Sequence, residues 1–333
     1  AERGVTHVRH AISPICDWRT GETTRPKCPL VNNENDPGVV FQPVTCYYPW
    51  PDDWVKQDDE ASGTNDNSGA PGMTAVALTI AGSDPSGGAG LQADLKTFHQ
   101  HRVYGASVVT LLTVQNTQMI ADILVLDAAF VLAQLDAVVA DLPPGAAKTG
   151  ALGSVEIVEA IAERAARFSF PLVVDPVMIS KHGAKLMDEP AAAALAKRLL
   201  PCAFLVTPNL PEASALSGRT VENLAAMEDA ARAIGDLGVQ NVLVKGGHLE
   251  GQAVDILWTD GEIHRFTSER IATPHTHGTG CVYSAAITAR LALGDELPVA
   301  VQRAKRFVTQ AIRTNPGLGH GLGPTNLFVD TED

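Results

Sequence analysis

From Thr74 onward, short apolar runs alternate with longer segments in which apolar residues recur at helical spacing. The apolar runs predict strands at 76–81, 107–114, 171–175, 203–206 and 241–245, and a hairpin of strands 254–258 and 262–266 around Asp260-Gly261. The helical segments are 91–100, 127–140, 155–167, 191–200, 209–216, 221–236, 281–293 and 297–313. Strands that alternate with helices usually pair in parallel and are covered on both faces. The pattern therefore predicts an α/β domain with a mostly parallel central sheet.

The first 72 residues show no sustained apolar period. They contain three of the four Trp and three of the five Cys. The stretch 61–69 is rich in Ser, Gly and Asn, a composition typical of a flexible linker. We expect residues 1–72 to form an extension that is disordered or loosely attached, and residues 73–333 to form one domain. A small binding module carried on the linker is the alternative.

Composition restricts the partners of this chain. The net charge of −13 and the pI near 5.2 argue against nucleic acid and anionic membrane as main partners. No apolar run is long enough to span a bilayer, and no apolar signal segment begins the sequence. The five cysteines are odd in number and no pair has close metal-ligand spacing, which favours a reducing, cytoplasmic compartment. A phosphate ligand would then need a local positive site or a metal ion.

A glycine turn precedes the helix predicted at 281–293. It reads Thr276-His277-Gly278-Thr279-Gly280-Cys281. Free backbone N–H groups and the helix dipole make such a turn a candidate phosphate site, and the same field would favour a thiolate at Cys281. The alternative is a tight turn with a small buried cysteine behind it. For His275 and His277, hydrogen bonding is favoured over metal binding because no third ligand is near in sequence.

Polar residues also follow the first two predicted strands, at the sheet end where α/β proteins bind ligands. The loop 82–90 is rich in glycine but matches neither a P-loop nor a dinucleotide fingerprint. It is either a plain strand–helix turn or a loop that lets a ligand approach the backbone closely. Asp94 either accepts from a ligand hydroxyl or faces solvent. The Gln115 amide offers a donor beside an acceptor, which matches a heterocycle that presents an N–H beside a ring nitrogen.

Three charged residues follow later strands. Asp175 ends one strand and Glu212 follows the next, so their carboxylates could hold Mg²⁺ through water. Helix capping is the alternative role for both carboxylates. Lys245 ends a further strand, where it would either meet a phosphate or neutralise the acidic site.

Together these motifs resemble the hydroxymethylpyrimidine/phosphomethylpyrimidine kinases of thiamin biosynthesis, members of the ribokinase-like superfamily. The resemblance runs from Met73 to the tail Gly319-His320-Gly321. The matching stretches are 78–98, Val114-Gln115-Asn116-Thr117, Lys148-Thr149-Gly150, Val174-Asp175-Pro176-Val177-Met178, Thr207-Pro208-Asn209-Leu210-Pro211-Glu212-Ala213, Lys245-Gly246-Gly247-His248 and the turn 276–281.

The resemblance implies a three-layer α/β/α domain that uses ATP and Mg²⁺. Cys281 would be the catalytic base, where most superfamily relatives carry Asp, and Gly278, Thr279 and Gly280 would complete an anion hole. Asp175 and Glu212 would place the metal, and Asn209 and Lys245 would lie beside the nucleotide phosphates. The pyrimidine would be bound by Gly82, Ala89, Asp94, Gln115 and Val177.

The chain departs from the family pattern at several positions. Ala151 stands where Met is common, which puts the size of the pyrimidine pocket in question, and His182 stands where Ser is usual, in a loop that could act as a lid. A homodimer is expected. A pyridoxal or pyridoxine kinase on the same scaffold is the nearest alternative, but such relatives tend to carry Met-Asp in place of Gln115-Asn116. A non-catalytic sensor that binds the pyrimidine is a third interpretation.

Overall fold

The computed structural model describes residues 74–180, 183–247 and 251–330. The predicted extension 1–72, its linker and the departure at His182 lie outside the described residues. Within the described ranges, no helix is both long and apolar enough to cross a bilayer.

One nine-stranded sheet organises this part of the chain, in the order β3-β2-β1-β4-β5-β6-β7-β8-β9. Pairing is parallel from β2 through β1, β4, β5 and β6 to β7. It is antiparallel at both edges, where β3 joins β2 and the β8–β9 hairpin joins β7. The predicted mostly parallel sheet is confirmed. The strands are β1 (Val76–Ser83), β2 (Tyr104–Gln115), β3 (Ile120–Val125), β4 (Ala146–Thr149), β5 (Leu172–Val174), β6 (Leu205–Val206), β7 (Asn241–Val244), β8 (Ala253–Thr259) and β9 (Glu262–Ser268).

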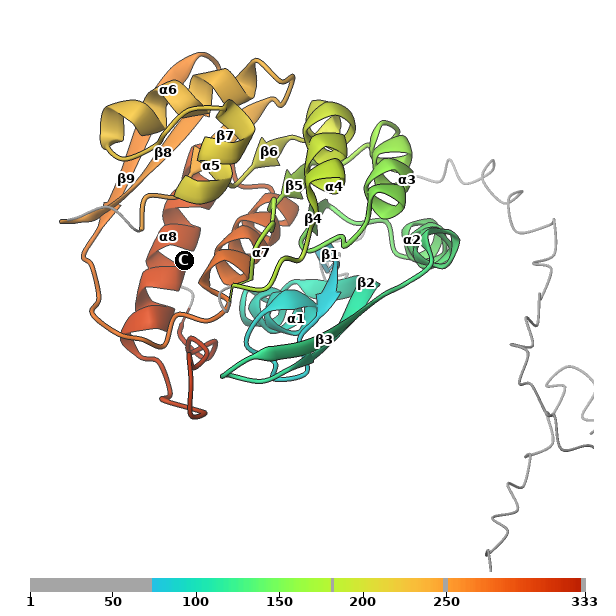
Figure 1. Cartoon of the computed structure of the whole chain (residues 1–333), viewed down its shortest axis with the longest axis horizontal. Helices are drawn as coiled ribbons and strands as arrows, with labels where there is room; N and C mark the ends of the chain where they lie inside the picture. The colour runs from blue at the N-terminus through green and yellow to red at the C-terminus, as the bar shows by residue number, and fades with distance from the viewer. Residues whose placement is uncertain (1–73, 181–182, 248–250, 331–333) are drawn as a thin grey trace, which may run out of the picture. The chain divides into compact units, whose positions relative to one another are not determined.

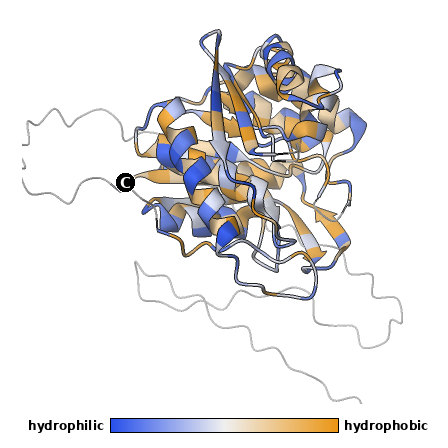
Figure 2. Ribbon diagram, turned by 90° about the vertical axis from the view of Figure 1, so that its left-hand side faces the viewer, coloured by the Kyte–Doolittle hydropathy of each residue, from blue (hydrophilic) through white to orange (hydrophobic). Residues whose placement is uncertain are grey.

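Helices cover both faces of the sheet (Figure 1). Helices α1, α7 and α8 pack on one face, and α2 to α6 pack on the other. Alternate residues of the central strands enter the two cores: Val173 faces α7 and α8, whereas Val174 faces the opposite layer. Figure 2 shows the resulting apolar interior between the helix layers. The helices are α1 (Gly90–Gln100), α2 (Ala128–Asp141), α3 (Val155–Ala165), α4 (Glu189–Ala194), α5 (Leu210–Ser217), α6 (Leu224–Gly235), α7 (Thr279–Ala292) and α8 (Leu297–Arg313).

Two details differ from the pattern read in the sequence. Strands β3 and β4 were not predicted. The helix expected over 191–200 is α4 followed by a π-helical turn, Leu195–Leu199, and a 3₁₀ turn, Leu200–Cys202. Pro201 explains the end of the α-helical hydrogen bonds, because its ring lacks an N–H that could continue them.

Candidate active site

A cavity of about 550 Å³ opens at the carboxyl ends of the parallel strands. Every site residue predicted from the sequence lines it, so residues far apart in the chain meet in one place. Those residues are Gly82, Ala89, Asp94, Gln115, Asp175, Val177, Asn209, Glu212, Lys245, Gly278, Thr279, Gly280 and Cys281. Ala151, which departs from the expected family pattern, lines the same cavity.

The glycine turn at the start of α7 presses against the loop 82–90. Gly278 has a positive φ of 74°, and a Cβ on this residue would collide with the carbonyl oxygen of Gly88. Glycine is therefore required here both by conformation and by space. Among the residues that the structure describes, no side chain caps the first turn of α7. The turn lines the cavity, so the positive end of the α7 dipole lies beside it, although the Thr279 N–H already donates to Thr276 O at 3.3 Å.

The thiol of Cys281 does not have the lowered pKa expected from its place at a helix N-terminus. Burial raises the pKa of Cys281 to about 11, the ammonium of Lys148 lowers it in part, and the carboxylates of Asp94 and Asp175 raise it again. Some of the side chain stays accessible in the cavity. The expectation is wrong because removing the charged thiolate from water costs more than the helix field returns.

A buried ion pair lies under the cavity. Lys148 Nζ donates to Asp94 Oδ1 at 2.8 Å, and Thr79 Oγ1 donates to Asp94 Oδ2 at 2.7 Å; neither charged side chain is exposed. Burial alone would lower the pKa of Lys148, but Asp94, Cys281 and Asp175 outweigh it and raise that pKa. Asp94 therefore does not face solvent. The role of Lys148 was not predicted, although the Lys148-Thr149-Gly150 stretch was noticed.

Asp175 and Lys245 form a second pair beside the glycine turn. Lys245 Nζ donates to Asp175 Oδ1 at 2.9 Å, and the hydroxyls of Thr207 and Ser284 donate at 3.3 Å. Burial would raise the pKa of Asp175, but Lys245 and Lys148 hold it below its ordinary value. A Cβ on Gly280 would lie 3.4 Å from Lys245 Nζ, so the turn approaches this pair closely.

Asn209 and Glu212 form a capping box at the start of α5. Glu212 N donates to Asn209 Oδ1, and Asn209 N donates to Glu212 Oε2, each at 2.9 Å. The capping alternative for Glu212 is confirmed, and the same carboxylate also lines the cavity. Burial raises the pKa of Glu212 to about 7; Lys245 lowers it and Asp175 raises it.

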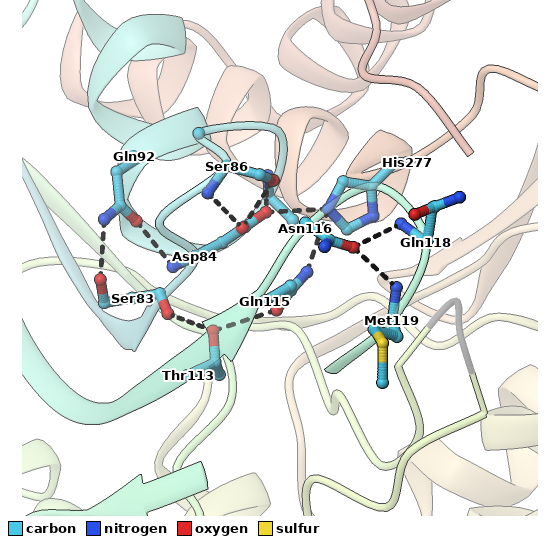
Figure 3. Close-up of polar contacts among 12 residues, drawn as sticks. Ser83, Asp84, Ser86, Gln92, Thr113, Gln115, Asn116, Gln118, Met119 and His277 are labelled. Carbon is cyan, nitrogen blue, oxygen red and sulfur yellow. Dashed lines mark hydrogen bonds and ion pairs between the residues drawn. The ribbon is translucent and has the colours of Figure 1, made fainter. Parts of the chain in front are cut away.

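A polar network holds Gln115 (Figure 3). His277 Nε2 lies 2.8 Å from Asp84 Oδ2, and Gln115 Nε2 lies 3.2 Å from the same ring nitrogen. Thr113 Oγ1 is 3.1 Å from Gln115 Oε1. The predicted hydrogen-bonding role of His277 is confirmed. Asp84 and His277 were not predicted as site residues, because nothing in the sequence joins positions 193 residues apart.

The model of the phosphomethylpyrimidine kinase family matches residues 84–326. The chain belongs to this family. Among family relatives, the hydroxymethylpyrimidine/phosphomethylpyrimidine kinase of Synechococcus elongatus is 48% identical over 255 residues, which cover 76% of this chain and 97% of that protein. The thiamine biosynthesis bifunctional protein ThiED of Geobacter sulfurreducens is 49% identical over 269 residues, which cover 80% of this chain and only 55% of that longer protein.

Solved structures of similar kinases superpose on the described fold. The phosphomethylpyrimidine kinase of Clostridium difficile 630 gives a TM-score of 0.65 at 43% identity, covering 72% of this chain and 100% of that one. An ADP complex of Bacillus subtilis pyridoxal kinase gives a TM-score of 0.70 at 40% identity, covering 76% of this chain and 97% of that one. The ribokinase-like three-layer architecture expected from the sequence is therefore confirmed.

Proposed function

We propose that this protein is an ATP- and Mg²⁺-dependent kinase that phosphorylates 4-amino-5-hydroxymethyl-2-methylpyrimidine and then its monophosphate, in thiamin biosynthesis. One observation carries the proposal: the Gln115 amide and the glycine turn at 278–281 line the same cavity. A pyrimidine held at the amide can thus present its substituent to a phosphoryl group held at the turn. Membership of the phosphomethylpyrimidine kinase family supports this reading.

The residues of the cavity supply alignment, charge stabilisation and a proton acceptor. In the first step the substrate hydroxyl oxygen attacks the γ-phosphorus of ATP, the bond to the β-phosphate oxygen breaks, and ADP leaves. Cys281 accepts the hydroxyl proton as a thiolate, and Lys148 together with a backbone hydrogen bond from Gly90 favours this ionised form. N–H groups of the glycine turn and the Lys245 ammonium stabilise the charge on the transferred phosphoryl group.

A magnesium ion fits the donors between Asp175 and Glu212. The two carboxylates repel each other, since Asp175 raises the pKa of Glu212, and a divalent cation would relieve that repulsion. Across the described part of the chain, no three His, Cys, Asp or Glu side chains form a ready metal cluster. We therefore expect the ion to be held through water and nucleotide phosphates, as Mg²⁺ commonly is, and to neutralise phosphate charge.

ADP release tests the function directly. The full chain is assayed with hydroxymethylpyrimidine, with its monophosphate and with pyridoxal. We expect turnover of both pyrimidines and a lower kcat/KM for pyridoxal. A preference for pyridoxal would establish the alternative kinase activity, and binding without ADP release would establish the sensor.

Selectivity is tested at Gln115. Replacing Gln115 by Met removes the donor and acceptor offered to the aminopyrimidine, and unpaired polar edges cost roughly 1–3 kcal/mol. We expect kcat/KM for the pyrimidine to fall on the order of tenfold while pyridoxal is less affected. A Gln115→Glu variant, which keeps size and an acceptor, is the matched control. Equal losses on both substrates would make Gln115 a structural residue.

A homodimer and a cytoplasmic location belong to the same proposal. Leu112, Val114 and Leu124 are exposed apolar side chains on β2 and the edge strand β3, and such edges favour association. Light scattering of the full chain should give the mass of two copies; the mass of one copy would contradict the dimer.

A further inference from the structure

Asp84 lies directly after β1, and its side chain is only 4% exposed. Its Oδ1 accepts from Ser86 N at 2.9 Å and from Ser86 Oγ at 2.7 Å, and its Oδ2 accepts from Ala89 N at 2.9 Å. Burial would raise the pKa of Asp84, but hydrogen bonds from His277 and Ser86 outweigh it and lower that pKa. Because three donors from Ser86 and Ala89 point at its oxygens, independently of His277, the carboxylate is ionised at neutral pH and can only accept hydrogen bonds.

This fixes the hydrogen on the adjoining ring nitrogen. His277 Nε2 lies 2.8 Å from Asp84 Oδ2, so it must carry a hydrogen and donate it, whatever the state of the other ring nitrogen. A protonated ring nitrogen has no lone pair left to accept with. The Gln115 amide atom 3.2 Å away can therefore not be a donor. The nitrogen and oxygen ends of an amide have nearly the same shape, and the hydrogen-bond count assigns the oxygen to this position.

A second count, at the other end of the amide, gives the same answer. The Thr113 hydroxyl has one hydrogen to donate. Its Oγ1 lies 2.9 Å from Ser83 O, which can only accept. It also lies 3.1 Å from the second amide atom of Gln115. If that atom is the NH₂ group, it donates to Thr113 and Thr113 donates to Ser83. If it were the oxygen, the NH₂ group would face the N–H of His277 Nε2, and the hydroxyl hydrogen would also have to serve two acceptors. In the assigned orientation one hydrogen, that on Nε2, is shared between Asp84 and the Gln115 carbonyl.

We propose that Asp84 and His277 hold the Gln115 amide with its carbonyl towards His277 and its NH₂ towards Thr113, and that this orientation selects the substrate ring. The remaining carbonyl lone pair and amide hydrogen then meet a ligand in one order. A ring with an amino group beside a ring nitrogen binds with the amino group on the His277 side. Pyridoxal carries no such pair. The role of the amide in substrate choice rests on the proposed function, whereas its orientation does not.

His277 is thus a positioning residue that acts through Gln115. The first test observes the free, full-length protein by NMR with ¹⁵N-labelled histidine. We expect the resonances of His277 to show a protonated Nε2, and Asp84→Asn to change them. An unprotonated Nε2 in the wild-type protein would overturn the inference, even in a fully active kinase.

The second test measures steady-state kinetics of His277→Phe, His277→Gln and Gln115→Met, with His277→Phe also placed in the Gln115→Met chain. In His277→Phe the amide is free to rotate, so KM for hydroxymethylpyrimidine should rise on the order of tenfold while KM for ATP is unchanged. His277→Gln keeps an N–H donor and should restore most of the selectivity. In the Gln115→Met chain, His277→Phe should leave the ratio of pyrimidine to pyridoxal kcat/KM unchanged. The effects of the two substitutions are not additive, because His277 acts on this ratio through the amide that Met has already removed.

The outcomes separate this inference from the proposed function. A parallel fall of kcat on both substrates in His277→Phe, with their ratio unchanged, would show that His277 only supports the glycine turn and would overturn the positioning role. A change of the ratio in the Gln115→Met chain would overturn it as well. A wild-type chain that phosphorylates neither pyrimidine would refute the proposed function, and the NMR result would still decide the orientation of Gln115.

Discussion

Cys281 is expected to matter more for one phosphorylation than for the other. The hydroxyl nucleophile of the first step must lose a proton, whereas a phosphate monoester, with a second pKa of about 6, is largely ionised at neutral pH. Cys281→Ala should therefore lower kcat on hydroxymethylpyrimidine by roughly 10²-fold or more, and kcat on the monophosphate much less. Single-turnover rates on the two substrates measure this. Equal losses would place Cys281 in the anion hole and remove it as a base.

The raised pKa of Cys281 also predicts a pH dependence. With a pKa of about 11, the thiol is protonated at neutral pH and its thiolate fraction grows as pH rises. The kcat/KM for hydroxymethylpyrimidine should therefore increase from neutral pH towards pH 10. In Cys281→Asp the acid has an ordinary pKa of about 4, so the rising limb should disappear over this range. A profile that is flat in the wild-type chain and unchanged in the variant would contradict the assignment.

Glu212 allows the metal role to be separated from the cap. Gln is accepted in a capping box, so Glu212→Gln should keep α5 and the melting temperature close to wild type. Because the variant loses a carboxylate charge beside Asp175, the Mg²⁺ concentration at half-maximal rate should rise several-fold. An unchanged Mg²⁺ titration would remove Glu212 from the metal site.

The residues of the cavity could be identified from the sequence, but their states could not. Each predicted residue lies at or just after the carboxyl end of a strand, or near the start of a helix, and the parallel sheet brings those points together. The pKa of Cys281 depends on burial and on Lys148. The orientation of the Gln115 amide depends on its contact with His277, which Asp84 holds. These partners come from different elements, so no local pattern in the sequence links them.

At the scale of elements, the turn before α7 can be compared with the glycine after it. Gly278 and Gly294 both have positive φ, but only at Gly278 would a Cβ strike another part of the backbone. Gly294→Ala should cost about 1–2 kcal/mol of stability and leave kcat unchanged. Gly278→Ala should lower kcat on the order of 10²-fold or more, because the turn must move away from the loop 82–90. Urea denaturation and kcat measure the two effects, and similar kcat values would contradict the role of the turn.

The two strands that the sequence did not reveal were hidden for different reasons. Strand β4, Ala146–Thr149, is short and contains two alanines and a buried lysine, residues that are depleted in strands. Its lysine pairs with Asp94 on α1, which is far away in the sequence. Strand β3, Ile120–Val125, lies at the sheet edge with much of its surface exposed, so it shows no clear alternation of apolar and polar residues. Long amphipathic helices such as α8 carry a stronger local signal and were predicted.

At the scale of the whole molecule, residues 73–333 are expected to suffice for activity. The first strand begins at Val76, and the family match begins at residue 84. A chain shortened to 73–333 should keep the kcat and KM of the full chain, and its melting temperature should change little. Limited proteolysis of the full chain should cut first between residues 58 and 72. An insoluble or inactive shortened chain would show that the domain boundary is wrong.

The contact between Asp84 and His277 also sets a delay during synthesis on the ribosome. These residues lie 193 positions apart, and at about 5–20 residues per second roughly 10–40 s separate their translation. Until α7 emerges, the face of β1 that holds Ala77 lacks the alanines of α7 that cover it, although α1 is already complete. During this interval the nascent chain exposes apolar surface that chaperones can bind. The substrate pocket is therefore among the last parts of the domain to become functional.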